Sequence, residues 1–179
     1  TNDFWCCVGS GMETHSKHGE SIYWREGENN LLVNLFIPST LDWRERGAKF
    51  ELSTEYPNAG EIVFALSKIE KPSEFSISMR IPYWTENPTL KINGKKAKIK
   101  NQNGYATVKR KWKTGDSISL NLPMKPRIEA TQDNSKVIAI LNGPLVLAAD
   151  LGESSKPFDF IEPALVGNDL LASLIPVSA

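Results

Sequence analysis

Residues 75–81 read Phe75-Ser76-Ile77-Ser78-Met79-Arg80-Ile81, an unbroken alternation of apolar and polar side chains. Successive side chains of a β-strand point to opposite faces of its sheet, so a period of two is typical of a strand with one buried face. The stretch therefore predicts a half-buried strand, and it sets the pattern for most of the chain.

Other short apolar or alternating runs lie on both sides of this stretch, at the spacing typical of β-sandwiches: residues 31–37, 61–66, 89–92, 105–108, 117–122 and 136–141. Asn93-Gly94 and Asn103-Gly104 supply residues that tolerate positive φ in tight hairpins, and Thr114-Gly115-Asp116 supplies a further turn. Short strands with regular turn signals predict a mainly β fold, an antiparallel β-sandwich.

The N-terminal region has a different period. Five residues between positions 11 and 24 fall on one helical face: Met12, His15, Gly19, Ile22 and Tyr23. Glu13 and Lys17 are spaced to form an i,i+4 ion pair. We therefore predict one short amphipathic helix over Gly11–Trp24, ended by the turn at residues 27–30.

Composition narrows the classes of partner. The chain has 179 residues, enough for one domain with a sizeable core, with 21 Lys plus Arg against 21 Asp plus Glu. This balance of charge favours neither nucleic acid nor an anionic membrane as partner. The local group of lysines at 95, 96, 98 and 100 indicates a solvent-exposed hairpin. The sequence contains no run of the roughly 20 apolar residues that form a transmembrane helix. It begins at Thr1 without a methionine or a signal peptide, so we expect it to be a piece of a longer chain, and its compartment stays open.

Cys6 and Cys7 are the only cysteines of the chain. Adjacent cysteines close a disulfide only with strain, so thiols are expected. Two neighbouring thiolates fit a metal ligand set or an activated sulfur nucleophile, although two small apolar side chains that fill a packing gap are an equally good interpretation. A zinc finger is disfavoured because its cysteines are about two to four residues apart, and a structural zinc site needs about four ligands. The nearby candidates for the other ligands are His15, His18, Glu13 and Glu20, of which packing or surface pairing explains the histidines and the glutamates more simply.

Several aromatic residues of the predicted sandwich have the chemistry to stack on sugar rings: Trp43, Tyr56, Tyr83, Trp84 and Trp112. Core packing is the simpler interpretation, because large aromatic side chains dominate core energetics. Exposure of their rings separates the two alternatives.

A series of motifs resembles the C-terminal part of glycoside hydrolase family 127, the β-L-arabinofuranosidase group, from Phe4 to about Ala149. Its members are Cys6-Cys7-x-Gly9-x-Gly11-Met12-Glu13-x-His15-x-Lys17, residues 32–39, Arg80-Ile81-Pro82-x-Trp84, Ile92-Asn93-Gly94, Gly104-Tyr105, Trp112-x-x-Gly115-Asp116, Leu122-Pro123-Met124 and residues 142–146. The cysteine pair with its glycines and the Arg-Ile-Pro-x-Trp strand are the most specific.

The resemblance implies a division into three parts. Residues 1–28 would be the end of a catalytic (α/α)6 barrel, residues 29–150 the β-sandwich, and residues 151–179 a linker or a truncated C-terminal element with a weak helical stretch near Leu170–Leu174. The rest of the barrel, a carbohydrate substrate and a second copy of the enzyme are then the expected partners, with no nucleic acid and no membrane.

The resemblance also implies the chemistry. Cys6 would be both nucleophile and zinc ligand, and Cys7 a second zinc ligand, while a Glu-x-Cys motif and a glutamate acid/base would lie before the pair, where this sequence has only Thr1–Trp5. Zinc would hold a thiol, whose ordinary pKa is about 8.5, as the nucleophilic thiolate of a retaining glycosidase. The leading interpretation is a fragment of such an enzyme, inactive alone, acting on β-L-arabinofuranosides or related plant cell-wall sugars. A non-catalytic accessory or carbohydrate-binding module is the alternative, and a free-standing thiol or metal protein is a third.

Overall fold

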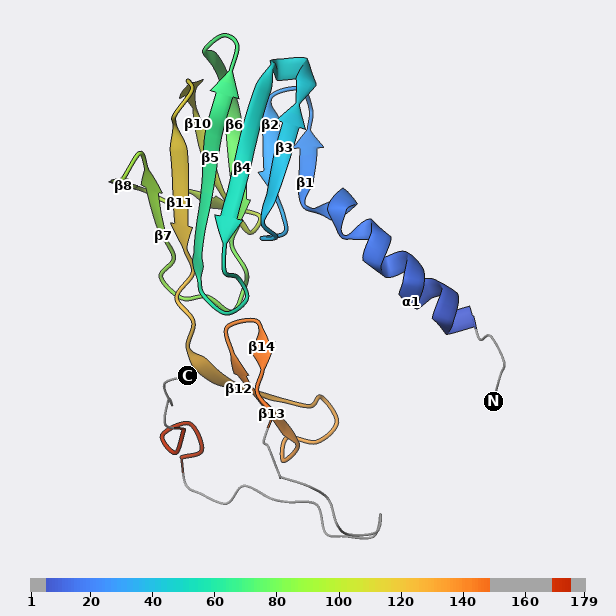
Figure 1. Ribbon diagram of the computed structural model, residues 1–179. Coiled ribbons are helices and arrows are strands. Elements are labelled where there is room, and N and C mark those ends of the chain that lie inside the picture. Colours follow the sequence, from blue (N-terminus) through green and yellow to red (C-terminus); the bar gives the residue numbers. More distant parts are fainter. Residues whose placement is uncertain (1–5, 149–168, 175–179) are drawn as a thin grey trace. The chain divides into compact units, whose positions relative to one another are not determined.

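The computed structural model describes residues 6–148 and 169–174, and the chain divides into two compact units, with the boundary in the sequence between Pro123 and Met124 (Figure 1). Each unit has its own sheets. The sandwich expected over residues 29–150 therefore spans both units. The expected linker falls mostly outside the described residues, at 151–168 and 175–179.

Unit 1 begins with the helix α1 (Cys6–Lys17) and a single 3-10 turn, η1 (Gly19–Ser21). The helix starts earlier than predicted and ends earlier, because Tyr23 already belongs to the strand β1 (Tyr23–Glu26). Ile22 and Tyr23 fit a helical face as well as a strand, and the pairing of β1 with the next strand decides between them. The predicted helix over Gly11–Trp24 is thus corrected at both ends.

Two sheets make up the rest of unit 1. Sheet A has the strand order β1-β2-β6-β10-β9, with β2 (Asn30–Val33), β6 (Ser73–Arg80), β9 (Asn101–Gln102) and β10 (Tyr105–Trp112). Sheet B has the order β3-β4-β5-β11-β7-β8, with β3 (Ser39–Trp43), β4 (Ala48–Thr54), β5 (Glu61–Ile69), β7 (Thr89–Ile92), β8 (Lys95–Ala97) and β11 (Ser117–Asn121). The 3-10 turn η2 (Arg44–Arg46) joins β3 to β4. The antiparallel sandwich predicted from the alternating runs is confirmed.

One pair departs from the antiparallel rule. β2 pairs with β6 in parallel, with Leu32 opposite Ser78, whereas β10 pairs with β6 antiparallel, with Thr107 opposite Ser78. β3, β4 and β5, all in sheet B, lie between β2 and β6 in the chain. Sheet A is therefore assembled from segments far apart in sequence.

The core lies between the two sheets and consists of the inward side of the alternating runs. Phe50 and Phe64 of sheet B stack with ring centroids 4.7 Å apart, and Phe75 of sheet A packs edge-on against Phe50. The buried Trp112 indole donates a hydrogen bond to the Phe75 carbonyl oxygen at 2.9 Å, so its polar atom is satisfied. These apolar faces, set by the period of two, are what hold sheets A and B together.

Close backbone contact fixes the end of the sandwich near Gly60. The Leu122 amide donates to the Gly60 carbonyl oxygen at 2.8 Å, and a Cβ on Gly60 would lie 2.0 Å from the Leu122 carbonyl oxygen. Only glycine fits there. Asn93 and Gly94 form the predicted hairpin turn, with positive φ angles of 50° and 76°. The lysines 95, 96, 98 and 100 that follow are exposed, as a solvated hairpin requires.

Unit 2 is a three-stranded antiparallel sheet in the order β12 (Pro126–Ala130), β13 (Ile138–Asn142) and β14 (Leu145–Val146). Ile128 pairs with Ile140, and Leu141 is buried. The expected helical stretch at Leu170–Leu174 is a turn instead, in which Asp169 Oδ1 accepts a hydrogen bond from the Ala172 amide at 3.0 Å. Within residues 6–148 and 169–174 no helix has the length and apolar character that a membrane crossing requires.

Candidate functional site

The cysteine pair opens the helix α1. Cys6 is its first residue, and the Cys7 side chain is exposed. The aligned peptide dipoles of a helix place partial positive charge at its N-terminus, so the pair lies at the positive end of α1.

The two histidines lie at the other end of the helix. Their rings stack with centroids 5.9 Å apart, and both side chains are exposed. From Cys7 to His15 the helix rises about 12 Å, at about 1.5 Å per residue. Zinc binds sulfur at about 2.3 Å and imidazole nitrogen at about 2.0 Å, so this helix cannot bring Cys7 and His15 to one ion.

The two glutamates are on the surface. Glu13 forms the predicted ion pair with Lys17 at 3.0 Å, and Glu20 is exposed in η1. Within the described part of the chain no three His, Cys, Asp or Glu side chains gather closely enough to hold a metal ion. Glu13 and Glu20 therefore act as solvated side chains in this structure.

The aromatic residues singled out from the sequence are mostly packing residues. Trp43 and Trp112 are 8% and 1% exposed, and Tyr56 and Trp84 pack against the core. Tyr83, at 84% exposed, is the exception. The core-packing interpretation is thus confirmed for Trp43 and Trp112.

The aromatic residue that sequence reasoning missed is Trp24, which is 54% exposed. Because residues 11–24 were assigned to a helix, Trp24 was not considered among the aromatic residues of the sandwich. The segment Tyr23-Trp24-Arg25-Glu26 is short for a period to be recognised, and its strand nature depends on the partner β2.

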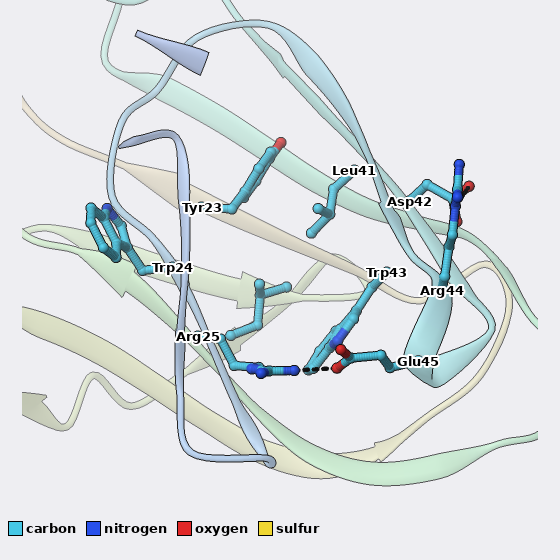
Figure 2. Close-up of a pocket in the computed structure, with 9 residues that line it drawn as sticks. Tyr23, Trp24, Arg25, Leu41, Asp42, Trp43, Arg44 and Glu45 are labelled. Carbon is cyan, nitrogen blue, oxygen red and sulfur yellow. Dashed lines mark hydrogen bonds and ion pairs between the residues drawn. The ribbon is translucent and has the colours of Figure 1, made fainter. Parts of the chain in front are cut away.

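A cleft of about 360 Å³ lies between β1 and β3, which are edge strands of sheets A and B (Figure 2). The residues that line it are Tyr23, Trp24, Arg25, Leu31, Leu41, Asp42, Trp43, Arg44 and Glu45. Figure 2 shows Tyr23, Leu41 and Trp43 gathered on one side of β1, with the Trp24 ring directed to the other side. The cleft floor is thus part of the core, not a separate aromatic platform.

Two exposed ion pairs lie at the rim of the cleft. Arg25 forms an ion pair with Glu45 across the cleft, and Arg44 Nε lies 3.6 Å from Asp42 Oδ2. Tyr23 bonds with Ser39, their oxygens 2.9 Å apart. Burial raises the pKa of Tyr23 above 10.0, and the bond to Ser39 offsets part of this rise. A protonated tyrosine that bridges the two sheets fits a structural role.

Comparison with known proteins identifies the sandwich. Residues 30–124 match the family model described as the middle domain of GH127 beta-L-arabinofuranosidase. The match runs from the first residue of β2 to just past the boundary of unit 1. Among curated proteins none matches the chain.

Solved structures resemble the chain over most of its length. A GH127 beta-L-arabinofuranosidase from Geobacillus stearothermophilus T6 has 27% identity and a TM-score of 0.70 over 79% of this chain and 23% of its own. A protein described as a glycoside hydrolase has the same identity and TM-score over 79% of this chain and 25% of its own. A GH127 beta-arabinofuranosidase, at 24% identity, shares the fold with a TM-score of 0.60 over 70% of this chain and 23% of its own. The chain thus spans about a quarter of the length of these proteins.

Proposed function

Because the chain belongs to the GH127 beta-L-arabinofuranosidase family through its middle domain, we propose that it is part of a zinc-dependent retaining glycoside hydrolase in which Cys6 is the nucleophile. The substrates would be β-L-arabinofuranosides or related plant cell-wall sugars. The family match over residues 30–124 is the observation that carries this proposal.

The position of the cysteines supports it. Cys6 and Cys7 stand at the start of α1, and only η1 separates α1 from β1, which pairs with the first strand of the matched domain. Ile22, between η1 and β1, is buried in the core of unit 1. The pair is therefore joined to the family domain by a short connection with a buried anchor.

The proposed reaction needs a sulfur nucleophile and an acid. The Cys6 thiolate would form a C–S bond to the anomeric carbon as the glycosidic C–O bond breaks, while an acid outside the described residues protonates the leaving oxygen. A water molecule, losing a proton to the conjugate base of that acid, would then attack the same carbon and displace the Cys6 sulfur as thiolate. Two displacements at one carbon retain its configuration.

The described residues do not by themselves complete a zinc site. Thiolates are ligands that zinc prefers, but a zinc site with protein ligands alone takes about four, and Cys6 and Cys7 are two. When bound, zinc supplies charge that keeps a thiol deprotonated. The other ligands would come from outside residues 6–148 and 169–174.

Substitution of the cysteines tests the proposal in the protein that contains this chain. With p-nitrophenyl β-L-arabinofuranoside as substrate, Cys6→Ser should lower kcat by roughly 10³-fold or more, because the nucleophile is lost. Cys7→Ala should mainly lower the bound zinc, measured by atomic emission. Ser16→Ala, an exposed change on the same helix, should alter neither. A Cys6→Ser protein of near-normal rate would refute the role of Cys6.

An accessory role is the second candidate, and the same match favours it. The matched family region is described as a middle domain, and every buried residue of the core except Ile22 lies within it. If Cys6→Ser and Cys7→Ala leave both the rate and the bound zinc of the whole protein unchanged, this part of the protein acts as a support or binding domain.

A further inference from the structure

The register of sheet A places a row of side chains on the face turned away from the core. Across β1, β2, β6 and β10 this row consists of Trp24, Leu32, Ser78 and Thr107. The next row consists of Glu26, Asn30, Ser76 and Lys109. Their sequence neighbours Leu31, Ile77 and Val108 are buried on the opposite side. We call these two rows the outer face.

Hydrogen bonds tie the outer face into one network. Asn30 Nδ2 donates to Glu26 Oε2 at 2.7 Å, and Ser78 Oγ donates to Asn30 Oδ1 at 2.9 Å. Ser78 Oγ and Thr107 Oγ1 are also 2.9 Å apart. The bonds fix the orientation of these side chains across four strands. Ser78 is 2% exposed and supports the network from beneath, whereas the more exposed carboxylate, amide and hydroxyl groups of Glu26, Asn30 and Thr107 retain capacity for hydrogen bonds to a ligand.

A hollow of about 250 Å³ lies over this network, lined by Glu26, Asn30, Leu32, Ser78, Asn103, Tyr105 and Thr107. The Tyr105 hydroxyl at its edge donates to Asn34 Oδ1 at 3.0 Å, which holds the ring in place. Pockets for drug-sized ligands measure about 300–1,000 Å³, so a hollow of this size suits a single sugar ring.

Trp24 stands beside the hollow, next to Leu32 in its row. It is 54% exposed, and it is the only large exposed hydrophobic side chain of the outer face among the described residues. Figure 2 shows its ring on the side of β1 opposite to Tyr23. From Trp24 on β1 to Thr107 on β10 the face crosses three strand spacings, or about 14 Å, at about 4.8 Å each.

The chemistry of the outer face selects the ligand. An indole offers an apolar surface to the C–H groups of a sugar, and the network offers partners for its hydroxyls. Glu26, Lys109 and the nearby Arg80 do not give the face a single sign of charge, so a neutral ligand fits.

We propose that the outer face of sheet A binds a neutral oligosaccharide, with one ring in the hollow between Asn30 and Thr107 and the next against Trp24. The site lies on β1, β2, β6 and β10 and uses neither cysteine. It therefore goes beyond the proposed hydrolase and does not depend on the role of Cys6.

Calorimetric titration of the full chain with arabinotriose, a neutral pentose oligosaccharide, tests this site. Saturable binding is expected. Trp24→Ala should raise Kd by roughly tenfold or more, and Trp24→Phe should recover part of the loss because an aromatic face remains. Tyr83→Ala removes an exposed aromatic side chain elsewhere and is the matched control, expected to leave Kd unchanged.

A second change separates the network from the aromatic ring. Thr107→Val keeps the shape of the side chain and removes its hydroxyl, so it should weaken binding while circular dichroism shows an unchanged fold. Cys6→Ser should bind arabinotriose as the unaltered chain does, which separates this proposal from the hydrolase. Equal Kd values for Trp24→Ala and the unaltered chain, or absence of binding of both arabinotriose and xylotriose at millimolar concentrations, would overturn the site.

Discussion

Asp116 is a charged residue that the sandwich buries almost completely, at 1% exposed. Asn93 Nδ2 donates to Oδ1 at 2.7 Å, the Lys113 amide donates to Oδ2 at 2.9 Å, and Arg110 lies 3.6 Å from Oδ2. Burial alone would raise the pKa of Asp116, but these hydrogen bonds and the charges of Arg110 and Lys113 outweigh it and lower the pKa below 3.8. One carboxylate thus joins the β7–β8 turn to the β10–β11 turn.

Replacement of this carboxylate should cost stability in a pH-dependent way. Asp116→Asn is expected to lower the free energy of unfolding by about 1–3 kcal/mol at neutral pH. The asparagine would carry no charge, and its NH₂ group would face a donor or the Arg110 cation in place of a carboxylate oxygen. Since the pKa is lower in the folded chain than in the unfolded one, the contribution of Asp116 is fully present above about pH 4 and is lost as the pH falls through the folded value.

Urea unfolding of both proteins between about pH 2 and pH 7 measures this contribution. The unaltered chain should lose more stability at acid pH than Asp116→Asn does. Asp42→Asn, a change in an exposed pair with Arg44, is the control and should shift stability by less than about 0.5 kcal/mol. Parallel pH profiles for the unaltered chain and Asp116→Asn would contradict the assignment.

At the same scale, sequence alone identified residue types but not their surroundings. Thr114-Gly115-Asp116 was predicted only as a turn, and the contact of Asp116 with Asn93 depends on the pairing of β11 with β7. The cysteine pair was recognisable from its motif. Trp24 was not, because its exposure follows from the strand that Tyr23 begins.

The helix α1 differs from every strand of unit 1 in how little it buries. Its described side chains are exposed from Ser10 to Lys17, whereas β6 buries Phe75, Ile77, Ser78 and Met79. At 12 residues it is near the lower limit of about 12–15 for an isolated helix, and Gly9 and Gly11 each cost about 1 kcal/mol relative to alanine. Within this chain, α1 depends on little beyond its own backbone hydrogen bonds.

We therefore expect the amides of α1 to exchange with deuterium much faster than those of β6 and β10, measured by mass spectrometry of peptide fragments. Gly11→Ala should slow exchange in α1 alone, because a Cβ at residue 11 meets no atom within 4 Å and alanine favours the helix. Protection of α1 equal to that of β6 would show that the helix is stabilised by contacts this structure does not contain.

The strands were predicted correctly where apolar and polar residues alternate over a long run, so that one face is clearly apolar. The alternation over residues 75–81 became β6, and the runs over 105–108 and 117–122 became parts of β10 and β11. β3 and β4 were not anticipated, although Ala48, Phe50 and Leu52 of β4 alternate with exposed residues. Tyr23 and Trp24 of β1 were assigned to the end of the predicted helix, because a strand of four residues is too short to distinguish the two periods.

At the scale of the whole molecule, the central core belongs entirely to unit 1. Its buried members extend from Ile22 to Leu122, whereas among the described residues of unit 2 only Leu141 is a buried hydrophobic residue. The family match ends at residue 124, at this same boundary. Hydrophobic burial is the dominant stabilising term in a domain, so most of the stability should reside before Met124.

A chain that ends at Pro123 should therefore unfold cooperatively, with a Tm within about 3 °C of that of the full chain, measured by circular dichroism. The matched variant is Phe64→Ala, which removes a side chain that is 1% exposed and should lower the free energy of unfolding by about 3–5 kcal/mol. A broad, non-cooperative transition of the shortened chain would mean that unit 2 contributes to the core.

The parallel pairing of β2 with β6 has a consequence for the order in which the molecule is made. As the chain leaves the ribosome, the hairpin of β1 and β2 emerges early, but its neighbour in sheet A is synthesised only after β3, β4 and β5. Such non-local pairings form slowly because a long loop must close first. The row from Trp24 to Thr107 is completed only when β10 joins β6, so recovery of the proposed sugar binding after dilution from urea would report the completion of sheet A.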